Sequence, residues 1–223
     1  MTDTIRVLIV DDDALVRAGL RIMLGGAANI EVVGEAADGR EVLAAVDLHH
    51  PDIVLMDLRM TELDGIAATR LLRSQPHAPA ILVLTTFDID ELVLGALQAG
   101  AAGFLLKTAA PAEIICAIED VHRGDSSLSP AIARRLITMI AGDPAANARR
   151  EHDRDLLATL TPREREVANE VAHGHSNAEI AQQLHMSVPT VKAHVSRLLD
   201  KLDADNRVQI SLRVHSAEPL TGG

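Results

Sequence analysis

The sequence has very few aromatic residues and a single cysteine. Of 223 residues, two are phenylalanine (Phe87 and Phe104), and there is no tryptophan or tyrosine. Proteins that recognise single strands or RNA loops stack bases on aromatic side chains, so that class of binding is not expected. The lone Cys116 excludes an internal disulfide and favours a reducing compartment. Its apolar helical surroundings (114–118) predict a core position rather than a reactive thiol.

The chain also lacks long hydrophobic runs and an excess of basic residues. No apolar run approaches the ~20 residues of a membrane-spanning helix, and the first residues do not have the basic-then-apolar order of a signal peptide. We therefore expect a cytoplasmic protein with no membrane partner. The 21 Lys and Arg residues against 32 Asp and Glu give a net charge of −11. This charge argues against general nucleic-acid coating but leaves DNA binding by one local face open.

Residues 5–123 alternate between short apolar runs and amphipathic stretches. Strands without polar alternation, covered on both faces, are typical of parallel sheets. Five βα units predict an α/β fold with a doubly wound, five-stranded parallel sheet. In the first helix we expect Leu15, Leu20 and Leu24 to be buried. The expected strands are 6–10, 31–34, 52–56, 80–84 and 103–106, and the expected helices are 14–24, 39–48, 64–74, 88–99 and 111–122.

The remaining residues divide into a connecting segment and a small all-α domain. Within 124–155, residues 126–141 predict a helix with Pro130 at its first position. Residues 142–155 are polar, carry charges of both signs and lack apolar periodicity, which predicts a flexible linker. From 156 to 218 the pattern is helical only, at 162–173, 177–184, 188–202 and 205–215.

Polar residues follow four of the predicted strands. Asp11 and Asp12 follow the first, Asp57 the third, Thr85 the fourth and Lys107 the fifth. Parallel strands place these ends at one edge of the sheet, so the side chains should share a crevice. Clustered carboxylates repel one another unless a cation is present, and all-oxygen ligation suits Mg²⁺. Asp57 can then act as a nucleophile that forms an acyl-phosphate, with Thr85 and Lys107 contacting the phosphoryl oxygens.

The same segments resemble the receiver domain of two-component response regulators, which has a flavodoxin-like fold. The resemblance rests on Val7–Asp13, Asp52–Met60, Leu84–Asp88 and Gly103–Lys107. It implies that Asp57 is the phospho-acceptor and that Thr85 and Lys107 complete the catalytic set. Phe104 is implied to change rotamer together with Thr85 in the switch. The implied metal site consists of the acidic pair Asp11 and Asp12, Asp57 and the backbone carbonyl of Arg59.

Two positions depart from the receiver pattern. The family usually has proline four residues after the acceptor, where this chain has Thr61, and it usually follows the lysine with proline or aspartate, where this chain has Thr108. Both differences alter loop rigidity rather than charge. We therefore expect phosphorylation to be retained, with a changed lifetime of the phosphoryl group or turn geometry.

The C-terminal segment has the pattern of two helices joined by a tight turn. Ser176 with Glu179 has capping-box spacing, as does the pair Thr161 and Glu164 before it. A turn at 185–187 leads into a longer helix whose inward positions are Val191, Val195, Leu198 and Leu202. A second helix with a free polar face predicts a helix-turn-helix unit.

Residues 160–202 also resemble the LuxR-type helix-turn-helix. The resemblance rests on Leu160–Val167, Gly174–Ala181 and Ser187–Val195, and it implies that 188–202 is the recognition helix. Across 155–215, seven Lys and Arg face eight Asp and Glu, so we expect weak binding by one copy and useful affinity by two. The implied DNA-contacting residues are Ser187, Thr190, Lys192, Ala193, Ser196, Arg197 and Lys201.

Together the two resemblances imply a response regulator of the NarL/FixJ class that binds promoter DNA. A sensor histidine kinase is the implied phosphoryl donor, phosphorylation is expected to produce a homodimer, and RNA polymerase is a further candidate partner. One alternative is a regulator that works without phosphorylation and uses the receiver as a dimerisation scaffold. A phosphohydrolase is the other alternative, but Arg59 occupies the place where such enzymes need a second acidic residue, so we expect no enzyme.

Overall fold

The computed structural model describes residues 4–86, 90–125 and 146–217. The chain forms two compact units, Met1–Arg123 and Gly124–Gly223. Each unit has its own buried core, as two independent domains should. Within the described residues, no helix is both long and apolar enough to cross a membrane. The helix predicted at 126–141 lies outside the described residues.

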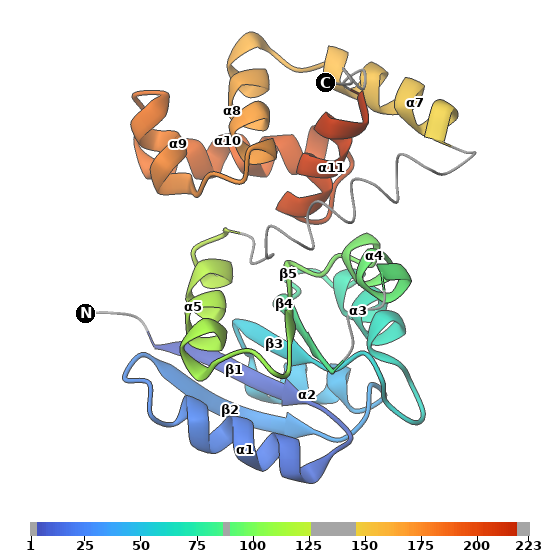
Figure 1. Ribbon diagram of the computed structural model, residues 1–223, viewed down its shortest axis with the longest axis vertical. Helices are drawn as coiled ribbons and strands as arrows, with labels where there is room; N and C mark the ends of the chain where they lie inside the picture. Colours follow the sequence, from blue (N-terminus) through green and yellow to red (C-terminus); the bar gives the residue numbers. More distant parts are fainter. Residues whose placement is uncertain (1–3, 87–89, 126–145, 218–223) are drawn as a thin grey trace. The chain divides into compact units, whose positions relative to one another are not determined.

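The first unit is built on a five-stranded, all-parallel sheet with the strand order β2-β1-β3-β4-β5 (Figure 1). This order confirms the doubly wound, flavodoxin-like fold. The connection from β2 to β3 crosses over β1, so that β1 lies between β2 and β3. The central strands are completely covered, which explains why their sequences lack polar alternation. The strands are β1 (Ile5–Val10), β2 (Ile30–Ala36), β3 (Ile53–Met56), β4 (Ala80–Thr85) and β5 (Gly103–Leu106).

Helices cover both faces of this sheet. On one face α1 (Ala14–Leu24) and α5 (Pro111–His122) pack over β1, β3 and β4. On the other face lie α2 (Val42–His49) and α3 (Gly65–Arg73), and α4 (Asp90–Gln98) packs beside α3 (Figure 1). The start of the helix expected at 64–74 is confirmed, because the Asp64 carboxylate caps α3 by accepting a hydrogen bond from the Ala67 amide.

Two burial predictions for this unit are wrong. Leu20 and Leu24 are buried, but Leu15 is 83% exposed, because five residues along a helix correspond to a rotation of about 140° and carry Leu15 to the opposite face. Cys116 is exposed, although Ile114, Ala117 and Ile118 around it are buried. An apolar neighbourhood in sequence therefore did not place the thiol in the core.

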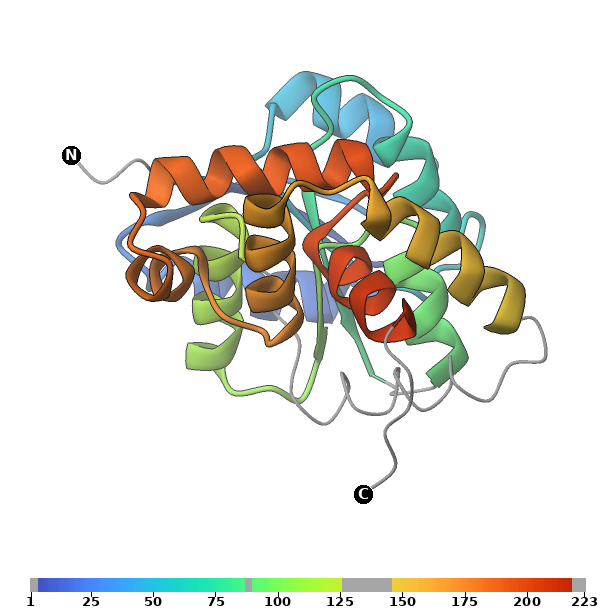
Figure 2. The ribbon, with the colours of Figure 1, turned by 90° about the horizontal axis from the view of Figure 1, so that it is seen from above.

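In the part of the second unit that the structure describes, the regular secondary structure is all helical. Its core contains Val191, Val195, Leu198 and Leu202 from α10, as the helical spacing predicted. Both predicted capping boxes are formed, by Thr161 with Glu164 and by Ser176 with Glu179. Figure 2 shows α10 along its length as the long orange-red helix. The helices are α7 (Ala146–Ala158), α8 (Pro162–Ala172), α9 (Asn177–Gln183), α10 (Val188–Lys201) and α11 (Arg207–Ala217).

The flexible linker predicted at 142–155 is wrong from residue 146 onward, because α7 begins at Ala146. The segment is rich in Ala, Arg and Leu, which favour helix even without an amphipathic stripe. Where burial is described, from residue 151 onward, Asp153 and Leu157 of α7 are buried in the second unit. Asp153 accepts a hydrogen bond of 2.9 Å from Arg213 of α11, so α7 is attached to the helical unit.

Candidate functional site

The carboxyl edge of the sheet brings together the polar side chains that follow β1, β3, β4 and β5. Asp57 is joined to the end of β1 by a hydrogen bond from its amide to the Val10 carbonyl. The Lys107 amide donates to the Thr85 carbonyl, which fixes the lysine beside the end of β4. Asp11, Asp57 and Thr85 are almost completely buried. The structure therefore places these predicted residues in one pocket.

Lys107 is the cationic centre of this pocket. Its Nζ lies 2.5 Å from Asp11 Oδ2 and 3.1 Å from Asp57 Oδ2. Burial raises the pKa of the Asp57 carboxyl above its ordinary value, and the hydrogen bond from Lys107 only partly offsets this. Burial alone would lower the pKa of Lys107, but its hydrogen bonds to Asp11 and Asp57 outweigh that effect and raise it. The ammonium therefore remains charged and is directed at Asp57.

Thr85 supplies a hydroxyl that has no hydrogen-bond partner in the described part of the chain. Its Oγ1 is buried, and it makes no hydrogen bond with any residue that the structure describes. A buried hydroxyl without a partner costs free energy, and such a group in a native structure calls for an explanation such as a catalytic role. Phe104, the other predicted switch residue, is fully buried on β5. The pocket thus holds a donor suited to an oxygen that is not part of the protein.

The donor set of the pocket fits a divalent cation. Carboxylate oxygens of Asp11, Asp12 and Asp57 lie within 4.8 Å of one another. Lys107 supplies one positive charge against these three carboxylates, so a net negative charge remains. Hard cations such as Mg²⁺ take oxygen ligands of this kind and keep several waters. The assignment of the Arg59 carbonyl as a further ligand remains a prediction.

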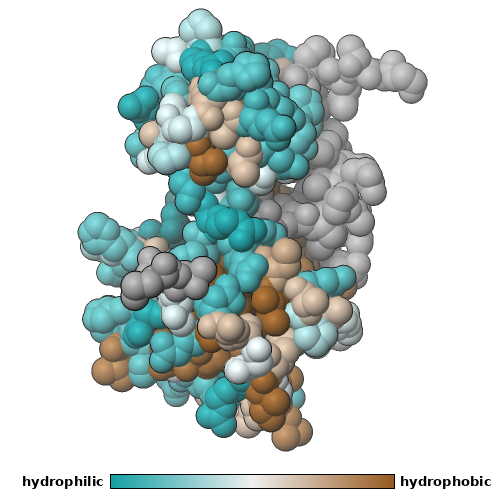
Figure 3. Space-filling model, turned by 90° about the vertical axis from the view of Figure 1, so that its left-hand side faces the viewer, coloured by the Kyte–Doolittle hydropathy of each residue, from teal (hydrophilic) through white to brown (hydrophobic). Residues whose placement is uncertain are grey.

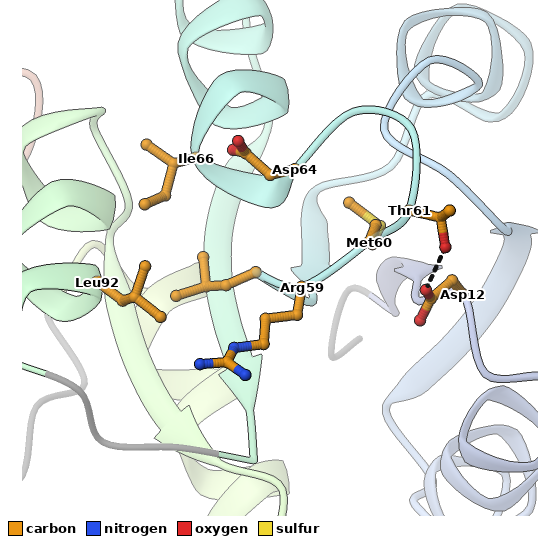
Figure 4. Close-up of a pocket in the computed structure, with 8 residues that line it drawn as sticks. Asp12, Arg59, Met60, Thr61, Asp64, Ile66 and Leu92 are labelled. Carbon is orange, nitrogen blue, oxygen red and sulfur yellow. Dashed lines mark hydrogen bonds between the residues drawn. The ribbon is translucent and has the colours of Figure 1, made fainter.

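A cavity of about 490 Å³ adjoins the acidic pocket and is lined by Asp12, Arg59, Thr61, Asp64, Ile66 and Leu92, among others (Figure 4). Across it, Thr61 Oγ1 donates a hydrogen bond of 3.1 Å to Asp12 Oδ2. This contact was not predicted, because Thr61 was noted in the sequence only as a departure from proline and no local pattern indicates a bond to Asp12.

The predicted DNA-contacting residues are all exposed on or beside α10: Ser187, Thr190, Lys192, Ala193, Ser196, Arg197 and Lys201. Figure 3 shows one face of the protein, on which the surface of the helical unit is mostly hydrophilic. Two of these residues also have structural partners. Ser187 Oγ caps α10 by accepting from the Thr190 amide, and Lys201 Nζ lies 2.7 Å from Glu164. The exposed face carries Lys192 and Arg197 as its cationic groups.

The structure combines a pocket of carboxylates, a lysine and a threonine at the edge of a doubly wound sheet with a helix-turn-helix unit. This combination defines the class of DNA-binding response regulators. Comparison with known proteins agrees with both parts. Residues 7–119 match the response regulator receiver domain, and residues 158–214 match the luxR family of bacterial regulatory proteins. The chain belongs to the two-component response regulators that carry a LuxR-type DNA-binding domain, as the sequence resemblance indicated.

Individual relatives match the whole chain or a part of it. The transcriptional regulatory protein LiaR of Bacillus subtilis (strain 168) is 39% identical over 214 residues, which cover 95% of this chain and 97% of LiaR. The crystal structure of a LuxR-family two-component response regulator from Aurantimonas sp. SI85-9A1 is 38% identical, has a TM-score of 0.57 and covers 60% of this chain and 96% of that one. The structure of response regulator ChrA, from a heme-sensing two-component system, is 33% identical with a TM-score of 0.53 and covers 95% of this chain and 96% of ChrA.

Proposed function

We propose that this response regulator is switched by Mg²⁺-dependent phosphorylation of Asp57 and binds promoter DNA as a dimer. The observation that carries the proposal is that a buried nucleophile lies beside two groups that could bind phosphoryl oxygens, the Lys107 ammonium and the Thr85 hydroxyl. Asp57 lies 3.1 Å from the Lys107 ammonium, and the buried Thr85 hydroxyl has no partner among the described residues.

The chemistry is an in-line transfer to a carboxylate. An oxygen of Asp57 forms a bond to the phosphorus of a phosphohistidine on the sensor kinase, and the phosphorus–nitrogen bond breaks. The electron pair returns to the imidazole, which takes up a proton from solvent. Bound Mg²⁺, held by Asp11, Asp12, Asp57 and the Arg59 carbonyl, would offset the charge on the carboxylates and the phosphoryl oxygens.

Phosphoryl oxygens give Lys107 and Thr85 new partners. The ammonium turns from the Asp11 and Asp57 carboxylates toward the phosphoryl group, and the Thr85 hydroxyl gains the acceptor it lacks. Movement of Thr85 toward the phosphoryl group changes the packing beside Phe104, so two arrangements of the β4–β5 region differ in stability. The phosphorylated arrangement is the one that dimerises.

DNA binding depends on pairing of the helical units. The domain is not basic overall, so one copy offers few contacts with DNA phosphates. Each such contact adds about −0.9 to the slope of the logarithm of the binding constant against the logarithm of the salt concentration. Two copies on adjacent half-sites combine their affinities without any new contact. Ser187, Thr190, Lys192, Ala193, Ser196, Arg197 and Lys201 are the residues that we assign to the DNA face.

Intact-mass analysis tests the phosphorylation step. The full chain is incubated with acetyl phosphate, with and without Mg²⁺, alongside Asp57→Asn. We expect one phosphoryl group to be added to the unsubstituted chain in the presence of Mg²⁺, and none without Mg²⁺ or in Asp57→Asn. Light scattering of the phosphorylated chain should then show a larger dimer fraction. An unmodified chain, equal modification of Asp57→Asn or an unchanged monomer–dimer balance would contradict the proposal. DNA binding of Asp57→Asn at the unsubstituted level would favour the scaffold alternative.

A further inference from the structure

We infer that the Thr61 hydroxyl is a positioning group for the metal site, which holds the Asp12 carboxylate in place for Mg²⁺. This inference rests on the proposed function, because it concerns the cation that phosphorylation of Asp57 requires. The observation is the hydrogen bond of 3.1 Å from Thr61 Oγ1 to Asp12 Oδ2 (Figure 4). Thr61 lies four residues beyond the acceptor in the sequence, and its hydroxyl donates to Asp12.

Asp12 needs external positioning more than the other two carboxylates do. Asp11 is buried and paired with Lys107, and Asp57 is buried and accepts from the Leu58 amide. Asp12 is exposed, and among the described residues Thr61 is the only hydrogen-bond donor to its carboxylate. Without this contact the side chain would move among rotamers, and binding a cation would have to order it.

The backbone that presents Thr61 is itself fixed. The next two amides, Glu62 and Leu63, both donate to Asp38 Oδ2, at 3.0 and 3.3 Å. The loop closes on itself through the Gly65 amide, which donates to the Leu58 carbonyl at 3.0 Å. Because this loop is fixed by its own hydrogen bonds, the Thr61 hydroxyl can restrict the position of the Asp12 carboxylate. Side chains that hydrogen-bond to metal ligands generally orient them and tune affinity.

The contact leaves Asp12 able to bind the cation. The hydrogen bond occupies one carboxylate oxygen on the side of Thr61, and the second oxygen remains available as a ligand. The Arg59 side chain, although it lines the same cavity, points away from Asp12 (Figure 4). The hydroxyl is thus the group that orients this ligand.

Calorimetric titration of the full-length chain with MgCl₂ tests the inference without using phosphorylation as the readout. Thr61→Val removes the hydroxyl and keeps the side-chain shape, and Thr61→Ser keeps the hydroxyl. We expect Thr61→Val to raise the dissociation constant for Mg²⁺ about three- to tenfold, less than the roughly 10–100-fold of buried outer-shell partners because this contact is exposed. Thr61→Ser should stay within about twofold of the unsubstituted chain.

Thr159→Val is the matched control, because it makes the same chemical change at an exposed threonine of the second unit, whose hydroxyl donates to Leu156. It should leave Mg²⁺ affinity unchanged. The melting temperature of Thr61→Val should also be unchanged, because an exposed hydrogen bond contributes little to stability.

The outcomes separate this inference from the proposed function. Equal Mg²⁺ affinity of Thr61→Val and the unsubstituted chain, with phosphorylation of both by acetyl phosphate, would overturn the inference alone. A loss in Thr61→Ser as large as in Thr61→Val would also overturn it, because the hydroxyl would then not be the cause. An unsubstituted chain that binds no Mg²⁺ and takes no phosphoryl group would overturn both.

Discussion

Thr85 and Thr69 are two buried threonines with opposite hydrogen-bonding situations. Thr69 Oγ1 donates to the Gly65 carbonyl at 2.6 Å within α3, whereas Thr85 Oγ1 has no partner among the described residues. Both residues are fully buried. The Thr69 hydroxyl has a structural partner, whereas we propose that the Thr85 hydroxyl serves a phosphoryl oxygen, and a substitution of the same kind distinguishes the two situations.

We expect Thr85→Val to increase the free energy of unfolding of the unphosphorylated receiver by about 1 kcal/mol, because it replaces an unsatisfied buried hydroxyl with a methyl group. Thr69→Val should decrease it by about 1 kcal/mol, because it removes a satisfied hydrogen bond. Urea unfolding of the two variants measures both changes. Destabilisation of similar size in both would show that the Thr85 hydroxyl is already used in the resting protein.

Glu164 gives the helical unit a defined dependence on pH. A hydrogen bond from Lys201, together with hydrogen bonds from Thr161, lowers the pKa of this carboxyl from 4.5 to about 2. Because the folded pKa lies below the ordinary value, the ionised carboxylate stabilises the fold above about pH 4.5, and this contribution is lost as the pH falls toward 2.

Thermal unfolding of Glu164→Gln tests this dependence. We expect the variant to melt a few degrees below the unsubstituted chain near neutral pH, and the difference to shrink as the pH falls below about 4.5. Glu166→Gln, an exposed neighbour paired with Arg163, serves as the control and should show little difference. A gap for Glu164→Gln that is constant with pH would contradict the assigned ion pair.

At the level of elements, strand ends and helix caps were predictable, whereas solvent-facing details were not. The ends of β1, β3, β4 and β5 follow from runs of buried residues that stop at a polar one, so the pocket residues could be found from the sequence. Cap residues in the sequence indicate where helices begin, as Thr161 and Ser176 do. The bond between Thr61 and Asp12 joins loops 49 residues apart, and no local pattern encodes it.

α7 shows a different limit of sequence-based prediction. Its sequence is mostly polar, so hydrophobic periodicity could not reveal the helix, and intrinsic helix propensity was the signal that mattered. Its contact with α11 through Asp153 and Arg213 depends on residues 60 positions apart. The helical unit therefore extends further toward the N-terminus than the LuxR-type resemblance implied.

Breaking this contact tests the place of α7 in the helical unit. We expect Asp153→Ala to destabilise that unit by about 2 kcal/mol, because it leaves the partly buried Arg213 without its carboxylate. Hydrogen exchange followed by mass spectrometry should then show faster exchange in both α7 and α11. Asp155→Ala, at an exposed position of the same helix, should leave exchange unchanged. Faster exchange in α7 alone would show that the two helices are not coupled.

At the scale of the whole molecule, we propose that the acidic pocket of one unit controls DNA binding by a helix of the other. The two units have separate cores, so each can keep its fold while their relationship changes. With a net charge of −11, the chain gains little from non-specific attraction to DNA. In the proposed function, control of dimerisation by Asp57 would therefore control DNA occupancy, because pairing multiplies a weak individual affinity.

The central claim is that the phosphoryl state of Asp57 sets DNA occupancy. It is tested most directly by footprinting the purified full-length chain on fragmented genomic DNA, with Mg²⁺ present and with or without acetyl phosphate, beside Asp57→Asn. The account predicts that acetyl phosphate strongly enriches sites containing two half-sites about one helical turn apart, and that Asp57→Asn shows no such response. The same occupancy for treated, untreated and Asp57→Asn protein would contradict it.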